Sequence, residues 1–286
     1  MHLASYNVRG RSGFGVVVGD GIVDLKPRLA PRYQSVLDLL RAEAMAEVQS
    51  VVAGVRADFP LSEVEFLPPV PGGEKILCIG VNYANRAAEL AGAGGNEEAK
   101  YPSMFFKPPN ALVGHNQPIL RPPESEQLEY EGEIALVIGR TGRRIAKDRA
   151  LDYVAGITLC NEGTIRDWIR HGRFNVTQGK SWEATGSIGP WMTTGVDLKR
   201  PLRITVKIND RVTQDDTSDH MIFGFVDILS YVSTFMTLKP GDIIATGTPI
   251  KLDQPPGERK WLKAGDTFEM TVPEVGTLRN VVRDEK

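Results

Sequence analysis

Short apolar runs broken by glycine and proline make up the chain from residue 74 onward, and this pattern restricts its possible folds more than any other feature. The 286 residues include 29 Gly and 19 Pro, more than the roughly 12% that the two contribute to an average chain. This density of turn formers favours many short strands over a helical bundle, so we expect an α+β fold that is mostly β. The candidate strands are Ile76–Val81, Ile134–Gly139, Ile204–Ile208, Ile243–Thr246 and Phe268–Val272. The candidate helices are Asn85–Ala91, Thr164–Arg170 and Phe225–Thr237.

The apolar pattern of residues 1–70 differs from that of the rest of the chain and predicts a small N-terminal α+β domain. Gly15–Asp24 consists of two apolar runs around Gly-Asp-Gly, which is typical of a β-hairpin. Val36–Ala57 carries apolar residues three or four positions apart and predicts an amphipathic helix. The Pro- and Gly-rich stretch Leu67–Gly73 has the composition of a linker. We therefore expect a second, larger domain over residues 71–286.

The charge balance and the apolar pattern exclude several classes of partner. Lys and Arg number 34 against 36 Asp and Glu, a formal net charge of −2, whereas nucleic-acid binding needs a surplus of clustered basic residues. No apolar run approaches the roughly 18 residues of a membrane span, and Arg9 and Arg11 stand where a signal peptide would be apolar. Cys78 and Cys160 lie in apolar runs, as buried thiols do. We expect a soluble cytoplasmic protein that binds neither nucleic acid nor membrane.

The strongest local motif is acidic. Glu129-Tyr-Glu-Gly-Glu133 leads directly into the apolar run Ile134–Gly139. Because strand side chains alternate, Glu129, Glu131 and Glu133 are expected on one face, where their carboxylates repel each other. A hard divalent cation would neutralise such a group. The alternative is a solvated acidic stretch without a ligand.

A second group of polar residues follows thirty positions later. Cys160-Asn-Glu162 ends an apolar run, and Arg166 lies in the first turn of the predicted helix Thr164–Arg170. Functional side chains often gather where a strand ends and a helix begins. An Arg in a first helical turn is unfavourable to the helix dipole. Arg166 therefore has either a ligand or a simple ion-pair partner.

Other motifs restrict the kinds of reaction that this chain could catalyse. Gly179-Lys-Ser181 lacks the upstream glycine of a phosphate-binding loop. The hydroxyls and backbone N–H groups of Thr246-Gly-Thr-Pro249 could hold a carboxylate, or form an ordinary turn. The sequence contains no Gly-x-Ser-x-Gly nucleophile motif. Its histidines do not form a metal-binding pair; they are His2, His115, His171 and His220. The chemistry must therefore depend on carboxylates, a cation, Arg and Lys.

Taken together, these segments resemble the fumarylacetoacetate hydrolase family over roughly residues 74–280. The matching segments are Ile79-Gly-Val-Asn-Tyr83, Phe106-Lys-Pro-Pro109, Tyr130–Gly139, Cys160-Asn-Glu162, Arg166-Asp-Trp168, Gly179-Lys-Ser181 and Leu238–Pro249. The resemblance implies a mixed β-roll with inserted helices, a catalytic domain over residues 71–286 and a homodimer. It also implies Mg²⁺ or Mn²⁺, with Ca²⁺ in some members, and a substrate that is a 2-oxo or 2,4-dioxo acid or its enol.

The family's site residues carry over one by one. Its metal ligands fall on Glu131, Glu133 and Glu162, and its active-site lysine falls on Lys180. The resemblance further implies substrate binding by three residues, Lys107, Arg166 and Thr248. The remaining catalytic candidates are Arg86 and Glu89, which are i,i+3 neighbours on the predicted helix Asn85–Ala91.

Two departures from the family pattern bear on the reaction. Most members have Asp where this chain has Glu162, and hydrolytic members have a His where Arg86 stands, paired with the glutamate matched by Glu89. Arg stays protonated and cannot act as a general base. The pattern resembles the branch that isomerises or decarboxylates dienoic 2-oxo dicarboxylates in aromatic catabolism, with Arg86 gripping a distal carboxylate. The alternatives are an acylpyruvate-type C–C hydrolase and a non-catalytic homologue.

Overall fold

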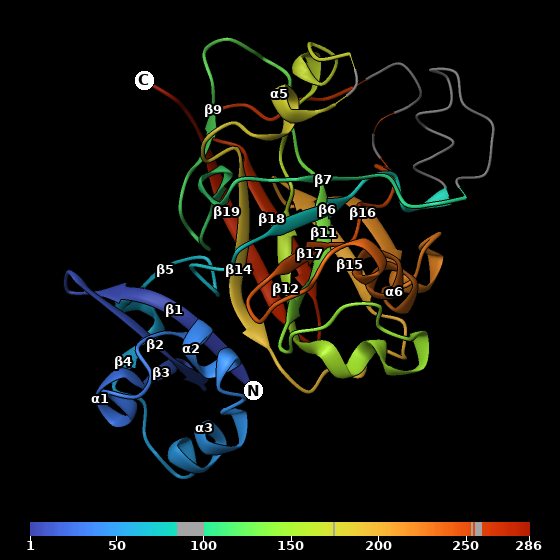
Figure 1. Ribbon diagram of the computed structural model, residues 1–286. Helices are drawn as coiled ribbons and strands as arrows, with labels where there is room; N and C mark the ends of the chain where they lie inside the picture. The colour runs from blue at the N-terminus through green and yellow to red at the C-terminus, as the bar shows by residue number, and fades with distance from the viewer. Residues whose placement is uncertain (85–99, 174, 253, 255–258) are drawn as a thin grey trace.

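The computed structural model describes residues 1–84, 100–173, 175–252, 254 and 259–286. The predicted helix Asn85–Ala91, with Arg86 and Glu89, lies outside these residues. Helices and strands are shown in Figure 1. The helices of the described part are α1 (Lys26–Leu29), α2 (Val36–Arg41), α3 (Met45–Val52), α5 (Thr177–Lys180) and α6 (Phe225–Phe235). Short 3-10 helices cover Leu61–Glu63, Pro109–Ala111, Lys147–Tyr153, Arg166–Trp168 and Ser218–His220.

A large mixed sheet runs through the whole molecule. Its strands, in sheet order, are β4 (Phe59–Pro60), β3 (Gly21–Asp24), β2 (Arg11–Val18), β1 (His2–Val8), β14 (Gly186–Thr193), β12 (Val154–Asn161), β11 (Gly132–Ile138), β17 (Ile243–Ala245), β6 (Ile76–Ile79) and β7 (Met104–Phe106). Two short strands pair with it from the side, β5 (Glu65–Phe66) with β1 and β8 (Leu112–Val113) with β14. Most of these pairs are antiparallel, but the pair of β17 and β6 and the pair of β14 and β8 are parallel.

A second sheet faces the first across the main core. Its strands, in sheet order, are β16 (Arg211–Thr217), β15 (Arg203–Ile208), β18 (Thr267–Val272), β19 (Gly276–Asp284) and β9 (Ile119–Arg121). A small two-stranded sheet pairs β10 (Leu128–Glu129) with β13 (Thr164–Ile165). The core cluster contains Leu136 of β11, Val206 of β15, Met270 of β18 and Leu229 of α6. The predicted α+β, mostly β fold is confirmed, and so are all five strand candidates.

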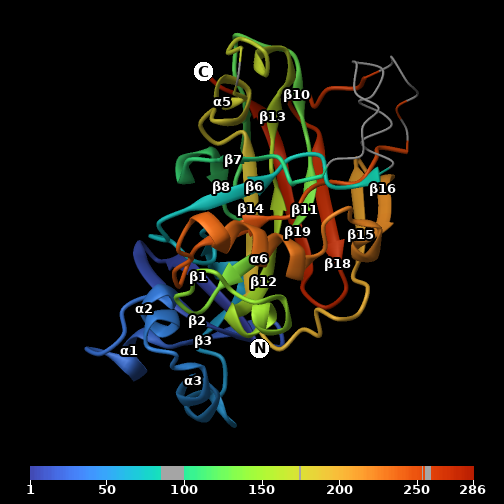
Figure 2. The same ribbon diagram turned by 45° about the vertical axis from the view of Figure 1, so that its right-hand side comes forward.

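The N-terminal elements gather on one side of the molecule in both views (Figures 1 and 2). The predicted hairpin within Gly15–Asp24 is confirmed as β2 and β3. The single helix predicted over Val36–Ala57 is wrong: α2 and α3 are separated at Glu43, which has a φ of 50°. A residue in the left-handed region ends a helix. Strand β1 pairs with β14, so the N-terminal strands continue the large sheet, and the division at residue 70 stays a prediction.

Two helix predictions in the larger part have different outcomes. Helix α6 confirms the prediction over Phe225–Thr237. The helix predicted over Thr164–Arg170 is wrong, because Thr164 and Ile165 form strand β13 against β10, and only a 3-10 turn follows. Both cysteines are free and buried, as expected. In the described part of the chain, no helix has the length and apolar composition needed to cross a membrane.

Candidate active site

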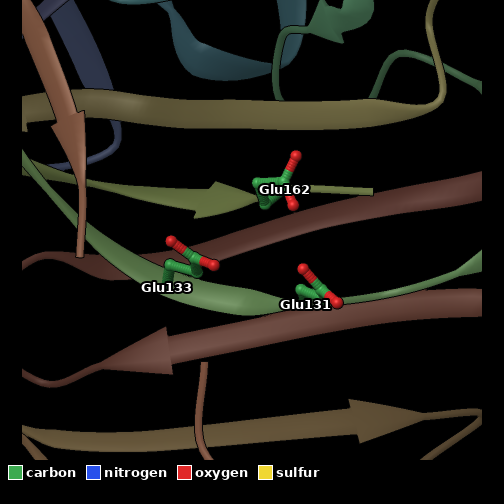
Figure 3. Close-up of side chains that lie close together, drawn as sticks. All are labelled: Glu131, Glu133 and Glu162. Atoms are coloured by element: carbon green, nitrogen blue, oxygen red, sulfur yellow. The ribbon is translucent and has the colours of Figure 1, made fainter. Parts of the chain in front are cut away.

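Strand register brings three glutamates together. Strands β11 and β12 are antiparallel, with Gly132 opposite Asn161. Continuing this register by one residue places Glu131 opposite Glu162, and the Glu162 N–H donates to the Glu131 carbonyl at 2.8 Å. Glu133 lies two residues beyond Glu131 and shares its face of the strand. Figure 3 shows the three side chains beside one another.

These three carboxyl groups are buried and crowded. Relative exposures are 6% for Glu131, 2% for Glu133 and 1% for Glu162, and one carboxylate oxygen from each lies within 4.8 Å of the other two. Burial raises the pKa of Glu133 well above its usual value, and the charges of Glu162 and Glu131 raise it further. Burial also raises the pKa of Glu162 to about 7, although Lys107 and Lys180 oppose the shift. The cluster needs positive charge.

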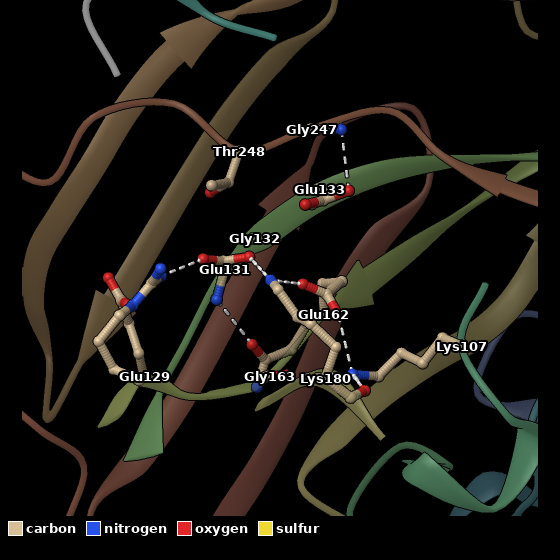
Figure 4. Close-up of polar contacts among 12 residues, drawn as sticks. Lys107, Glu129, Glu131, Gly132, Glu133, Glu162, Gly163, Lys180, Gly247 and Thr248 are labelled. Carbon is tan, nitrogen blue, oxygen red and sulfur yellow. Dashed lines mark hydrogen bonds and ion pairs between the residues drawn. The ribbon is translucent and has the colours of Figure 1, made fainter. Parts of the chain in front are cut away.

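Two buried lysines supply part of that charge (Figure 4). The Lys180 ammonium donates to Glu131 at 2.6 Å and also to Glu162. Burial lowers the pKa of Lys180, but Glu131 and Glu162 outweigh that effect and hold it above its usual value. Lys107 donates to Glu162 at 2.8 Å and to the carbonyls of Gly163 and Lys180 at 3.0 and 2.6 Å. Lys107 is therefore held behind Glu162 by protein groups.

An ion-pair chain reaches the cluster from its other side. Arg166 donates to Glu131 through Nη2 at 2.7 Å and to Glu129 through Nε. Glu129 is also paired with the fully buried ammonium of Lys251. The register of β10 with β13, in which Glu129 lies opposite Thr164, continues unshifted into that of β11 with β12, which agrees with the expected common face of Glu129, Glu131 and Glu133. Glu129 is not one of the three glutamates whose carboxylate oxygens lie within mutual reach.

The loop after β17 borders the cluster of Glu131, Glu133 and Glu162 on a third side. The Gly247 N–H donates to Glu133 at 2.8 Å, and Gly247 has a φ of +101°, which an L side chain rarely adopts. The Thr248 hydroxyl accepts a hydrogen bond from Gln214 Nε2 at 2.9 Å. Gln214 lies on β16 and is fully buried. The predicted Thr246–Pro249 segment thus borders the glutamates.

A cavity of about 610 Å³ opens over this arrangement, within the range of small-molecule sites. Its polar lining consists of Glu131, Glu133, Glu162, Arg166, Lys180 and Thr248 among others. Its apolar lining includes Ile79, Met104, Phe105, Phe106 and Ile169. Lys107 is not among the described residues that line it. No histidine is found among the lining residues that the structure describes.

Sequence reasoning missed two buried residues of this site. Gln214 lies in a strand of mixed polar residues, and Lys251 lies in an apolar loop, so neither has a local pattern that marks it. Both act through contacts distant in sequence, 34 residues from Gln214 to Thr248 and 122 from Lys251 to Glu129.

The donor set fits a divalent metal ion. Three buried carboxylates offer oxygen ligands within mutual reach, and hard divalent cations prefer oxygen ligands. The upward-shifted pKa values of Glu133 and Glu162 are those of carboxylates that lack sufficient positive charge. The cavity is also lined by two cationic side chains, Lys180 and Arg166, which could bind an anionic ligand.

The affinity for such an ion should depend on pH. A carboxylate must be ionised to bind a cation, so protons compete with the metal below the pKa of Glu162, about 7. Isothermal titration with Mn²⁺ is expected to show roughly tenfold weaker binding at about pH 6 than at about pH 8. An affinity that is unchanged between these values would contradict the role of Glu162 as a ligand.

Comparison with known proteins identifies the family to which this chain belongs. Residues 75–283 match the family described as fumarylacetoacetate (FAA) hydrolase, C-terminal. The mitochondrial oxaloacetate tautomerase Fahd2a of Rattus norvegicus is 33% identical over 288 residues, covering 98% of this chain and 88% of that protein. A 4-hydroxyphenylacetate degradation bifunctional isomerase/decarboxylase of Salmonella dublin is 35% identical over 219 residues, covering 76% of this chain and 48% of that protein.

A solved structure extends the likeness to the whole chain. The maleylpyruvate hydrolase from Sphingobium sp. SYK-6, in complex with manganese(II) ion and pyruvate, aligns over 100% of both chains, with a TM-score of 0.81 and 26% identity. The predicted family, its fold and enzyme status are thereby confirmed. The chain belongs to the fumarylacetoacetate hydrolase family, whose members are enzymes.

Proposed function

We propose that this enzyme moves a proton at the carbon next to the 2-oxo group of a 2-oxo dicarboxylate, and so interconverts its enol and keto forms with the help of a divalent metal ion. One observation carries the proposal: the Lys180 ammonium lies in the cavity within hydrogen-bond reach of two of three buried carboxylates. The site thus combines a proton carrier with a candidate metal centre. Such a pair meets the needs of an enolisation.

Glu131, Glu133 and Glu162 are the proposed metal ligands. Mg²⁺ or Mn²⁺ is the proposed ion, with Ca²⁺ as the alternative, and manganese is named in the Sphingobium neighbour. When bound, the ion would supply electrostatic stabilisation of the negative charge that develops on the 2-oxo oxygen. Lys107 keeps Glu162 oriented through its three hydrogen bonds.

The charge of the site favours a substrate with two carboxylates. Among the described residues, the ion-paired glutamates at or next to the cavity are Glu129, Glu131 and Glu162, and their cationic partners are Lys107, Lys180, Arg166, Lys251 and Arg259. A divalent ion at the cluster would add two positive charges, which a dianion would neutralise. Arg166 lines the cavity with an 18% exposed side chain, and Thr248 lines it as a hydroxyl donor. Both are proposed to bind substrate carboxylates.

Lys180 is the proposed proton carrier. Its pKa is high because Glu131 and Glu162 face its ammonium. Neutralising those carboxylates brings the pKa down towards the range in which a lysine exchanges protons readily. In ketonisation Lys180 would donate its proton to the enol carbon while the enol hydroxyl releases its proton to solvent, and Lys180 would then regain a proton from solvent. In enolisation the same proton transfers would run in reverse. Arg86 stays a candidate for gripping the distal carboxylate of the substrate, and Glu89 stays a catalytic candidate.

Oxaloacetate is the first substrate to test, because a relative that spans 98% of this chain is named an oxaloacetate tautomerase. The experiment is an NMR assay with Mn²⁺ and a panel that contains enol-oxaloacetate, a dienoic 2-hydroxy dicarboxylate and an acylpyruvate. We expect faster ketonisation of the dicarboxylate enols and no cleavage of the acylpyruvate. Cleavage of the acylpyruvate as the fastest reaction would replace the proposal with the hydrolase alternative.

Isomerisation or decarboxylation of a dienoic 2-oxo dicarboxylate is the second candidate. The Salmonella relative is named for both reactions, and each uses the same enolate stabiliser and proton carrier. The hydrolase alternative also has support from a similar structure, because one of them is named a maleylpyruvate hydrolase. Hydrolysis needs a base that activates water, however, and the described cavity lining contains no histidine. The family resemblance places Arg86 where the hydrolytic His would stand.

We further propose a cytoplasmic location and a homodimer. Two free, buried cysteines support a reducing compartment. The dimer rests on the family resemblance alone, and the molecular mass in solution would decide it against a chain mass of 31.4 kDa.

A further inference from the structure

Gln214 is a buried amide whose three hydrogen bonds all involve the site. Its Nε2 donates to the Thr248 hydroxyl at 2.9 Å and to the Pro249 carbonyl at 2.5 Å. Its Oε1 accepts from the Gly132 N–H at 3.3 Å, between two proposed metal ligands. The side chain is fully buried on β16, so water does not compete for these contacts.

These partners fix which end of the amide faces Thr248. A carbonyl such as that of Pro249 only accepts, and a backbone N–H such as that of Gly132 only donates. Turning the Gln214 amide over would set oxygen against the Pro249 carbonyl and NH₂ against the Gly132 N–H. Leaving buried polar groups so opposed is costly. The NH₂ group of Gln214 therefore faces the Thr248 oxygen.

This arrangement occupies one acceptor site of the Thr248 hydroxyl and leaves its proton available for donation. A hydroxyl has one proton to donate, and the Thr248 oxygen already accepts from Gln214. In the part of the chain that the structure describes, no protein group accepts a hydrogen bond from this hydroxyl, and the Thr248 side chain lines the cavity at 6% exposure. Its proton is thus available to a group in the cavity. Such a hydroxyl favours an anionic oxygen over a ligand group that must itself donate.

We propose that Gln214 is a specificity-determining residue, which presents the Thr248 hydroxyl as a hydrogen-bond donor to a carboxylate in the cavity. The identity of that carboxylate as the substrate's own rests on the proposed function. The role of Gln214 itself does not, because it concerns any carboxylate that binds against Thr248. Gln214 acts through Thr248 and touches no reacting atom.

Oxalate, a dianion that carries no donor, is a suitable probe. Its affinity is measured by calorimetry for the full chain with Mn²⁺, with Mg²⁺ and without added metal, in wild type and in Gln214→Met. Methionine keeps the length of glutamine and removes its donor. We expect about tenfold weaker oxalate binding, the effect of one lost hydrogen bond to a charged ligand. Gln254→Met is the matched control, because Gln254 is also a buried amide but binds the Lys260 carbonyl.

A double-mutant cycle separates the proposed role from a general loss of structure. In a Thr248→Val background, Gln214→Met should cause no further loss of oxalate affinity, and Mn²⁺ affinity should stay within about twofold of wild type throughout. Equal losses in both backgrounds, a fall in Mn²⁺ affinity that accounts for the oxalate effect, or no oxalate binding under any condition would overturn the proposal. If oxalate behaves as expected but oxaloacetate is not turned over, only the proposed function fails.

Discussion

Glu133→Gln is expected to remove Mn²⁺ binding while leaving the protein folded and, in the presence of chelator, more stable. Glu133 has no ion-pair partner in the described part of the chain, and its carboxylate accepts only from the Gly247 N–H. Glutamine keeps an oxygen that can accept this hydrogen bond and removes the buried carboxyl group of Glu133. The pKa of that carboxyl group is raised by burial and by the charges of Glu162 and Glu131. Calorimetry should show a loss of Mn²⁺ affinity of at least about a hundredfold, because losing a ligand exceeds the roughly ten- to hundredfold effect of losing an outer-shell partner of a ligand.

The stability gain has a definite pH dependence. Because the pKa of Glu133 is higher in the folded than in the unfolded protein, its ionisation destabilises the fold as pH rises. The advantage of glutamine should therefore be largest at about pH 8, on the order of 1–3 kcal/mol. Glu274→Gln, at an exposed turn residue, is the control and should change neither property. A variant that binds Mn²⁺ like wild type would exclude Glu133 as a ligand.

Lys180→Met is expected to lower kcat by about a hundredfold to ten-thousandfold with a smaller change in KM, because it removes the proposed proton carrier. The methionine also leaves Glu131 and Glu162 without the ammonium that bridges them. Stability should therefore fall in chelator and recover when Mn²⁺ is added. Lys147→Met, at an exposed lysine paired with Asp227, is the matched control. Full kcat with unchanged KM would exclude Lys180 from catalysis.

Local sequence patterns predict the parts of this fold that depend on neighbours in the chain. The strand around Ile134–Ile138 and helix α6 follow from apolar spacing, and the alternation rule places Glu131 and Glu133 on one face. The same rule extends to Glu129, whose register against β13 continues that of β11 against β12. Spacing does not report that Glu129 is ion-paired with Arg166 and Lys251, because these contacts are distant in sequence.

The third glutamate and the residues around the cluster needed more than local pattern. The ligand role of Glu162 follows from the family resemblance, and the β11–β12 register explains why Glu162 meets Glu131. Thr164 and Ile165, which the sequence pattern predicts to begin a helix, form a strand because β10 supplies a pairing partner. Gln214 and Lys251 are recognised only through their contacts with Thr248 and Glu129. Tertiary pairing decided each of these cases.

The most direct test of the central claim is the rate at which enol-oxaloacetate loses its ultraviolet absorbance in the presence of the enzyme. The account predicts fast ketonisation with Mn²⁺, loss of the enzymatic rate in excess chelator and its return when Mn²⁺ is restored. It also predicts that Lys180→Met stays near the uncatalysed rate under all three conditions. An enzymatic rate that persists in chelator, or that is equal in Lys180→Met, would contradict a metal-dependent proton transfer at this site.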